Sequence, residues 1–156
     1  YSWPNCVFLI LSQSEQGSIQ RHIDEKLRDN VIVDFVNPDK IADFLMLADI
    51  GIFFIKPCFS KTVSCPTKFA EYLACGLPVV INKGIGDTEE IVRENRIGVI
   101  VEDFTREEYR YKIAQLKELL QEGEGLKSRC RKVSERYFSL GEGVEKYFQL
   151  YSNLTK

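Results

Sequence analysis

The chain has 156 residues, of which 44% are hydrophobic and 28% are charged. This composition is ordinary for a soluble globular protein, and the length fits one domain with a substantial core. The formal charge of −2 and the lack of a basic stripe argue against a nucleic-acid partner. No apolar run approaches the roughly 20 residues of a membrane-spanning helix. The start has neither the basic nor the apolar region of a secretion signal, and its abrupt entry into a strand indicates that residues are missing upstream.

The cysteines favour a reducing compartment. They are Cys6, Cys58, Cys65, Cys75 and Cys130. Their number is odd and no two form a C-x-x-C pair, which argues against a disulfide framework or a zinc site. We interpret them as small buried or half-buried thiols.

The first two thirds of the chain alternate short apolar runs with amphipathic segments. The runs of strand length are Cys6–Leu11, Val31–Val36, Ile50–Ile55, Leu77–Ile81 and Gly98–Val101. Helices are predicted up to Asp29, after Asn37-Pro38-Asp39, between Pro66 and Gly76, and around Ile91 and Val92. Such alternation predicts an α/β fold, with a Rossmann-like parallel sheet and helices on both faces.

A helical tail over residues 105–156 follows the last strand. Its predicted helices are Arg106–Gln121, Leu126–Phe138 and Val144–Leu154. Glycine pairs at 123 and 125 and at 141 and 143 are expected to separate them.

The most informative helix lies between Pro66 and Gly76. Pro66 suits the first helical position, and Gly76 suits a left-handed C-terminal cap. Lys68 and Glu71 are three residues apart and therefore share a face. Because a helix N-terminus favours anions, this face predicts a phosphate at the N-terminus and a hydroxylated group beside Glu71.

Polar loops follow the predicted strands, where ligands bind in open parallel sheets. They include Ser12, Asn37-Pro38, the segment 56–67 and the glycine-rich Asn82–Asp87. The chain has no G-x-G-x-x-G after its first strand and no P-loop sequence. Gly84 and Gly86 fit either a phosphate-binding loop or a simple tight turn.

The segment 64–80, SCPTKFAEYLACGLPVV, resembles the signature helix of group-1 retaining glycosyltransferases of the GT-B fold. Gly84-x-Gly86-Asp87 and the helix and strand after it resemble the family's downstream loop. The resemblance covers roughly Val31 to Asp103. It implies that residues 1–156 are a single nucleotide-sugar-binding domain, the C-terminal half of a GT-B fold. The first strand of that domain and the N-terminal acceptor domain would be absent from this sequence.

The resemblance also implies roles for individual residues. Glu71 would bind the ribose hydroxyls. The diphosphate would lie at the turn before the helix, near Pro66, with Ser64, Thr67 and Lys68 as side-chain ligands. Asn37 and Pro38 would contact the base, and Gly84, Gly86 and Ser12 are weaker candidates. No catalytic residue is assigned, and neither a cofactor nor a metal is expected.

The family pattern is not complete, because many members carry a glutamate eight residues before Glu71, where this chain has Val63. We expect sugar transfer, hexosyl transfer in particular, in cell-surface polysaccharide or glycoconjugate synthesis, with this chain inactive alone. The alternative is a non-catalytic nucleotide-binding or scaffolding module on the same fold. The expected partners are a nucleotide sugar and the missing N-terminal domain. The expected location is the cytoplasm, with any contact to the inner face of the membrane made by the missing half.

Overall fold

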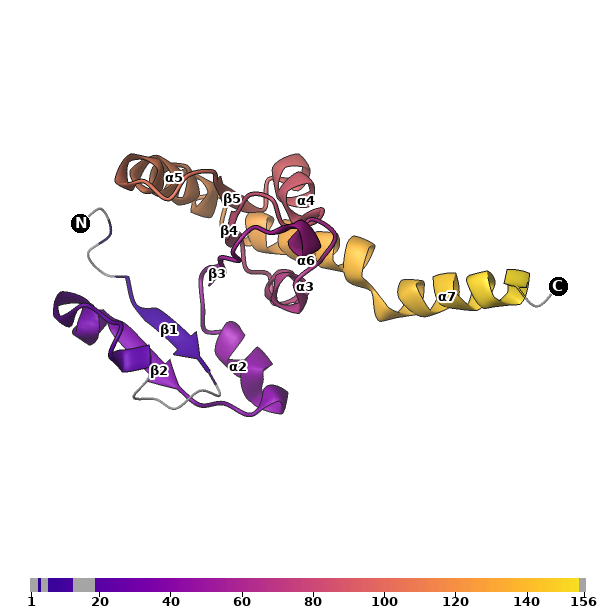
Figure 1. Ribbon diagram of the computed structural model, residues 1–156, viewed down its shortest axis with the longest axis horizontal. Helices are drawn as coiled ribbons and strands as arrows, with labels where there is room; N and C mark the ends of the chain where they lie inside the picture. Colours follow the sequence, from indigo (N-terminus) through magenta and orange to yellow (C-terminus); the bar gives the residue numbers. More distant parts are fainter. Residues whose placement is uncertain (1–2, 4–5, 13–18, 155–156) are drawn as a thin grey trace. The chain divides into compact units, whose positions relative to one another are not determined.

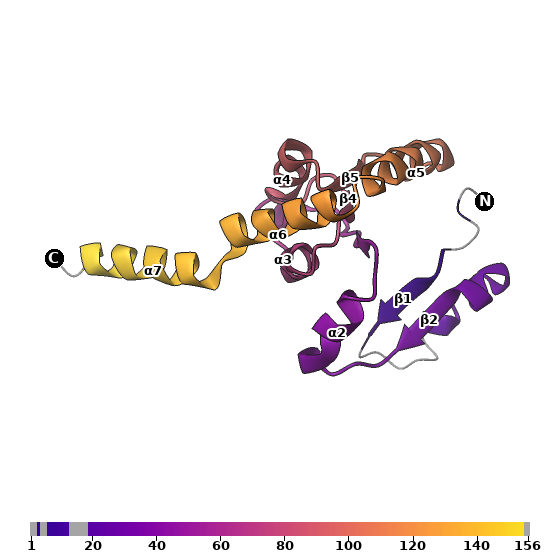
Figure 2. The same ribbon diagram turned by 180° about the vertical axis from the view of Figure 1, so that it is seen from behind.

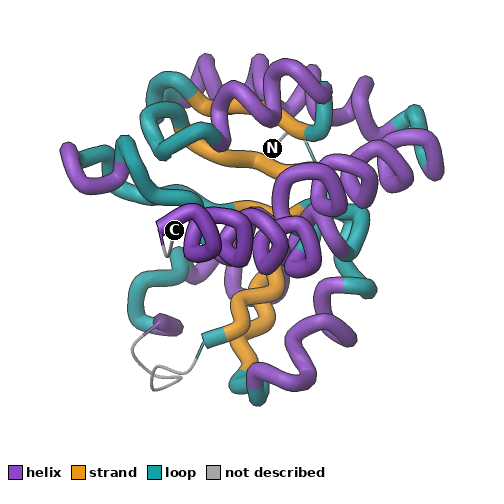
Figure 3. Tube along the Cα trace, turned by 90° about the vertical axis from the view of Figure 1, so that its right-hand side faces the viewer, coloured by secondary structure: helices purple, strands orange, loops and turns teal. Residues whose placement is uncertain are grey.

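A computed structural model of the chain describes residues 3, 6–12 and 19–154 (Figure 1). The chain divides into two compact units, Tyr1–Phe44 and Leu45–Lys156, and each is described by itself. The single domain over residues 1–156 stays a prediction. Most of the regular structure is helical, and the strands are short (Figure 3).

Two parallel strands pair in the first unit, β1 (Phe8–Leu11) and β2 (Val31–Asp34). The backbone N–H of Ser12 donates to the carbonyl of Asp34 at 3.1 Å and extends the pairing by one residue. Both strands are shorter than the apolar runs that predict them. The residues just before β2 form a helical turn. Cys6 and Val7, at the start of the first apolar run, therefore have no strand opposite them.

The helix predicted to reach Asp29 is only partly observed, because residues 19 and 20 are helical and residues 21–24 are not. Residues 25–30 form a 3-10 helix instead, η1 (Glu25–Asn30). The carboxylate of Asp24 accepts a hydrogen bond from the backbone N–H of Lys26 at 3.0 Å. This local bond starts a new helical turn and interrupts the apolar spacing on which the prediction rests. The start of the predicted helix and part of the polar loop predicted before it fall in residues 13–18, which lie outside the described residues.

A helical segment starts at the Asn37-Pro38 turn, as predicted. Asn37 is the N-cap of the 3-10 helix η2 (Pro38–Lys40), which leads into α2 (Ile41–Leu45). Proline suits this first helical position because its missing N–H would have no partner there.

The second unit contains three parallel strands in the order β3–β4–β5. They are β3 (Gly51–Ile52), β4 (Val79–Asn82) and β5 (Gly98–Val101). The helices are α3 (Thr67–Ala74), α4 (Thr88–Asn95), α5 (Arg106–Leu120), α6 (Glu124–Phe138) and α7 (Leu140–Leu154), with a 3-10 turn η3 (Phe59–Lys61). The predicted α/β class with parallel strands is confirmed, although the strands are distributed over two sheets.

Helices cover both faces of this second sheet. Phe53 lies on the inner face and meets Phe69 of α3 with ring centroids 6.3 Å apart. Phe54 points to the opposite face, where Tyr109 of α5 lies 6.4 Å from it. Val79 is fully buried on the inner face, which therefore holds the core.

Helix α3 is fixed against the sheet by close packing. The ring of Tyr72 lies directly over Gly51, where a Cβ would come within 2.2 Å of the ring. Gly51 therefore gives the tyrosine room in an otherwise apolar strand. Helix α6 packs along α3, and the two are seen side by side in Figures 1 and 2. The hydroxyl of Ser134 on α6 donates to the carbonyl of Ala70 on α3 at 3.3 Å.

The break predicted at Gly141 and Gly143 is wrong, because both glycines lie inside α7. Ser139 starts this helix. Its hydroxyl accepts from the N–H of Glu142 at 3.4 Å, and its carbonyl accepts from the N–H of Gly143 at 3.0 Å. A serine cap of this kind stabilises a first turn that contains glycine. None of the residues of α7 is buried.

Candidate functional site

Helix α3 ends as the sequence predicts and begins one residue later than predicted. Gly76 has a left-handed φ of 79°, and its N–H donates to the carbonyl of Leu73 at 2.9 Å. The N–H of Leu77 donates to the carbonyl of Tyr72 at 2.9 Å, which completes a Schellman motif. At the other end Pro66 is the N-cap and not the first helical residue. The helix therefore opens at Thr67 with N–H groups that have no partner within the helix.

The face of α3 that carries Lys68 and Glu71 is open to solvent, whereas Phe69 and Leu73 on the other face are fully buried. In the described part of the chain neither Lys68 nor Glu71 forms an ion pair. Both charged groups are consequently available to a ligand. This arrangement is the one that the sequence predicts for this helix.

The loop before α3 is held against the glycine-rich loop after β4. The N–H of Gly86 donates to the carbonyl of Lys61 at 2.9 Å. Gly86 has a φ of 46°, and a Cβ on it would lie 2.3 Å from the carbonyl oxygen of Ser64. Ser64 and Gly86, two candidate binding residues from separate segments of the sequence, therefore touch. Gly84 also has a left-handed φ, of 82°, and faces Pro57 of the same neighbouring loop.

Positive charge dominates these loops. Lys56 and Lys61 lie in the segment that leads to α3, Lys68 lies in its first turn, and Lys83 follows β4. No ion pair involves these four lysines within the described residues. Burial raises the pKa of the Cys65 thiol, and the nearby carboxylate of Asp87 raises it further. A strand edge with free lysines and free helical N–H groups suits an anion.

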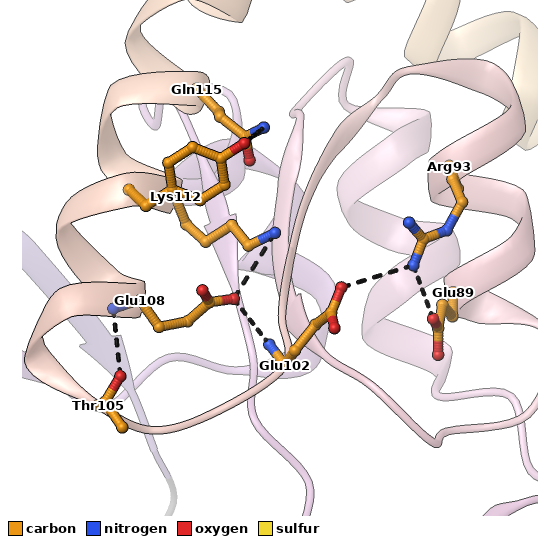
Figure 4. Close-up of polar contacts among 8 residues, drawn as sticks. Glu89, Arg93, Glu102, Thr105, Glu108, Lys112 and Gln115 are labelled. Carbon is orange, nitrogen blue, oxygen red and sulfur yellow. Dashed lines mark hydrogen bonds and ion pairs between the residues drawn. The ribbon is translucent and has the colours of Figure 1, made fainter.

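The carboxylates at the end of β5 are already engaged (Figure 4). Arg93 of α4 lies 2.9 Å from Glu89 and 3.9 Å from Glu102. The carboxylate of Glu108 on α5 accepts from the backbone N–H of Glu102 at 3.2 Å and pairs with Lys112 at 3.6 Å. These groups tie α4 and α5 to the end of the strand, so we assign them a structural role.

Three candidates belong to the first unit. Ser12 follows β1, and Asn37 and Pro38 start η2. Each unit is described by itself, so the proposed contacts of these residues with a ligand stay predictions. Val63, at the position of the family glutamate, is 87% exposed in the loop before α3.

The structure adds one residue that the sequence analysis does not single out. Asn82 ends β4, and only 1% of its surface is exposed. In the sequence it looks like the first polar residue of a loop, because Ile55, to which its side chain makes two hydrogen bonds, is distant along the chain. Among the described residues no group of three or more histidine, cysteine, aspartate or glutamate side chains could hold a metal ion. No described helix is long and apolar enough to span a membrane.

Comparison with known proteins identifies relatives of this architecture. A family described as "Glycosyl transferases group 1" matches residues 2–118. No curated protein matches the chain.

Several solved structures are similar to the chain. The glycosyltransferase WaaG, involved in lipopolysaccharide biosynthesis, is 16% identical with a TM-score of 0.65, over 86% of this chain and 35% of WaaG. Sucrose-phosphate synthase from Thermosynechococcus elongatus is 16% identical with a TM-score of 0.64, over 94% of this chain and 38% of the synthase. AviGT4, a glycosyltransferase involved in avilamycin A biosynthesis, is 21% identical with a TM-score of 0.50, over 94% of this chain and 44% of AviGT4. The chain thus spans less than half the length of these proteins, and at these identities the likeness shows the fold.

Proposed function

Because the chain belongs to the glycosyl transferases group 1 family, we propose that it is the donor-binding part of a glycosyltransferase. The enzyme would move a sugar, a hexose in particular, from a nucleoside-diphosphate sugar to an acceptor. One observation carries this proposal. The loop that leads into α3, whose exposed face carries unpaired Lys68 and Glu71, contacts the Gly84–Gly86 loop at the carboxyl edge of the sheet.

The diphosphate is proposed to bind at the start of α3. The free N–H groups of the first turn, the Lys68 ammonium and the hydroxyls of Ser64 and Thr67 would share its negative charge. The same charge grows on the leaving group during sugar transfer, so these donors would also stabilise the transition state electrostatically. Pro66 would shape the turn while donating no hydrogen bond itself.

Glu71 is proposed to bind the ribose. It lies about one helical turn after Thr67 on the exposed side, which matches the offset between a diphosphate and the sugar of the same nucleotide. A carboxylate can accept hydrogen bonds from both hydroxyls of a ribose. The proposed contacts of Asn37 and Pro38 with the base rest on the family resemblance alone.

Isothermal titration calorimetry with UDP and GDP tests the ribose role. Glu71→Gln should weaken binding about 10- to 100-fold, the cost of about 1.5–3 kcal/mol for hydrogen bonds to a charged group. A 2′,3′-dideoxy analogue of the same nucleotide should bind the wild-type chain and Glu71→Gln equally well. The control is Glu94→Gln, an exposed glutamate of α4, which should bind like the wild type. The proposal would be contradicted if no nucleotide bound at millimolar concentration, or if Glu71→Gln lost the same affinity for the ribonucleotide and for its dideoxy analogue.

The chain alone is proposed to be inactive, since the solved structures that it resembles are more than twice as long. Its partner would be an N-terminal domain of the same protein. The proposed acceptors are precursors of a cell-surface polysaccharide or glycoconjugate, which is supported by the involvement of the similar protein WaaG in lipopolysaccharide biosynthesis. A cytoplasmic location is supported by the five free cysteines.

A non-catalytic module on the same fold is the second candidate. The observation that favours it is Val63, an exposed apolar residue where many family members carry a glutamate. Transfer of a radiolabelled sugar by the full-length protein would exclude this candidate.

A further inference from the structure

The hydrogen-bond ladder between β3 and β4 ends on a side chain. The N–H of Gly51 donates to the carbonyl of Pro78 at 2.9 Å, and the N–H of Phe53 donates to the carbonyl of Val80 at 3.2 Å. The next donor in this two-residue period is Ile55, and the next backbone acceptor would be the carbonyl of Asn82. Instead, the N–H of Ile55 donates to the side-chain Oδ1 of Asn82 at 2.7 Å.

The rest of the Asn82 amide is also engaged. Its Nδ2 donates to the carbonyl of Ile55 at 2.8 Å and to the carbonyl of Lys83 at 3.0 Å. On the other side β4 stays paired with β5, because the N–H of Lys83 donates to the carbonyl of Val101 at 3.2 Å. The chain after β3 is therefore set off from β4 by the length of one side chain, while β4 and β5 remain together.

We infer that Asn82 is a positioning residue for the donor-binding loop. Its amide fixes the point at which the chain leaves the sheet and enters the segment 56–66, which leads to α3. The role in ligand binding rests on the proposed function. In its middle the same segment is held by the bond between Gly86 and Lys61, and nearer its far end Ser64 touches Gly86, so the segment is fixed at more than one point.

The residue type follows from the geometry. An asparagine amide carries an acceptor and two donors in one plane, as a peptide group carries an acceptor and a donor. It can therefore take the place of a backbone peptide group opposite Ile55, because it accepts from the N–H of Ile55 and donates to its carbonyl. Leucine has similar size but would leave the N–H and carbonyl of Ile55 without these partners. Ionised aspartate keeps the acceptor but cannot donate to Ile55 or Lys83.

The experiment compares Asn82→Leu with the wild-type chain by amide hydrogen exchange and by calorimetry with the nucleotide that the wild type binds best. Exchange in residues 55–66 should become at least about tenfold faster, since a lost rung frees the backbone locally. Nucleotide affinity should fall about tenfold, in line with one or two lost positioning hydrogen bonds. The matched control is Asn95→Leu. Asn95 donates to a backbone carbonyl, that of Ile91 at 2.8 Å, at the end of α4. This control should leave both quantities unchanged.

A purely structural role for Asn82 predicts another result. The urea midpoint would fall, while exchange in 55–66 and the affinity of the folded chain stay at wild-type values, and this result would overturn the inference. If Asn82→Leu does not fold, Asn82→Asp gives the same comparison, because it loses both donations. If the wild type binds no nucleotide, the proposed function fails, and the exchange rates alone then decide whether Asn82 orders the segment.

Discussion

The backbone N–H of Gly86 donates to the carbonyl of Lys61 at 2.9 Å and joins two loops that are 25 residues apart in the sequence. The bond sets the loop before α3 against the loop after β4. Because Gly86 has a positive φ and touches Ser64, any side chain at this position meets backbone that cannot move independently. The arrangement of the candidate site therefore depends on a residue without a side chain.

Gly86→Ala should reduce nucleotide affinity at least about tenfold and lower the free energy of unfolding by about 1–3 kcal/mol, because it adds backbone strain and a clash with Ser64. Calorimetry and urea unfolding measure the two effects. Gly123→Ala is the matched control. Gly123 has a φ of 56°, and a Cβ there would have no atom within 4 Å. The control should lose stability through strain and keep the affinity of the wild type. Equal affinity in both variants would show that the Gly86 contact does not shape the site.

Arg129 joins α6 to the end of α4. Its Nε and Nη2 donate to the carbonyl of Arg96 at 3.2 and 2.9 Å, and its Nη1 lies 2.7 Å from the carboxylate of Glu122. Arg96 has a left-handed φ of 49°, so this guanidinium holds an unfavourable backbone conformation at the helix C-terminus.

Arg129→Met should therefore lower the free energy of unfolding by about 1–2 kcal/mol, from the lost hydrogen bonds to the carbonyl of Arg96. The urea midpoint measures the loss. Lys132→Met, an exposed cation on the same helix, is the control and should be neutral. Nucleotide affinity should not change in either variant, since both residues lie outside the candidate site. A neutral Arg129→Met would mean that water replaces the guanidinium at no cost.

The buried thiol of Cys130 should make the chain less stable at alkaline pH. Burial raises the pKa of this thiol from 9.0 to about 11. Between these two values the unfolded chain loses the proton and the folded chain keeps it. The folded state then binds more protons, so the free energy of unfolding falls as the pH rises through this window.

Urea unfolding between pH 8 and pH 11 measures this decline. Cys130→Ala should be less stable at pH 8, through a small cavity, and should show a shallower alkaline decline. Cys58→Ala is the control, because Cys58 is exposed and a hydrogen bond with the Ser60 hydroxyl lowers the pKa of its thiol. This control should keep the full decline. Parallel curves for the wild type and Cys130→Ala would assign the decline to other groups.

Local signals predict much of this fold. The strand Gly98–Val101 is observed with the predicted bounds, and the left-handed Gly76 ends α3 as its sequence indicates. Both depend on neighbouring residues alone. The shared face of Lys68 and Glu71 follows from helical spacing in the same way.

Other features depend on partners that sequence spacing does not reveal. Asn82 bonds to Ile55 across the sheet, and Arg129 bonds to Arg96, 33 residues away. Ser139 overrides the effect of two glycines by capping α7. Asp24 redirects a segment whose apolar spacing indicates one helix. In each case a hydrogen bond from one polar side chain decides the backbone path, and the spacing of apolar residues does not predict that bond.

Helix α7 has a practical consequence for handling the protein. Its apolar side chains are open to water, with Tyr147, Phe148 and Leu154 exposed by 66%, 67% and 73%. A strip of this kind favours self-association at high concentration. A chain shortened after Ser139 would lose the strip and keep Phe138, which packs against the core. Such a shortened chain offers a more soluble starting point for calorimetry and for spectroscopy at millimolar concentration.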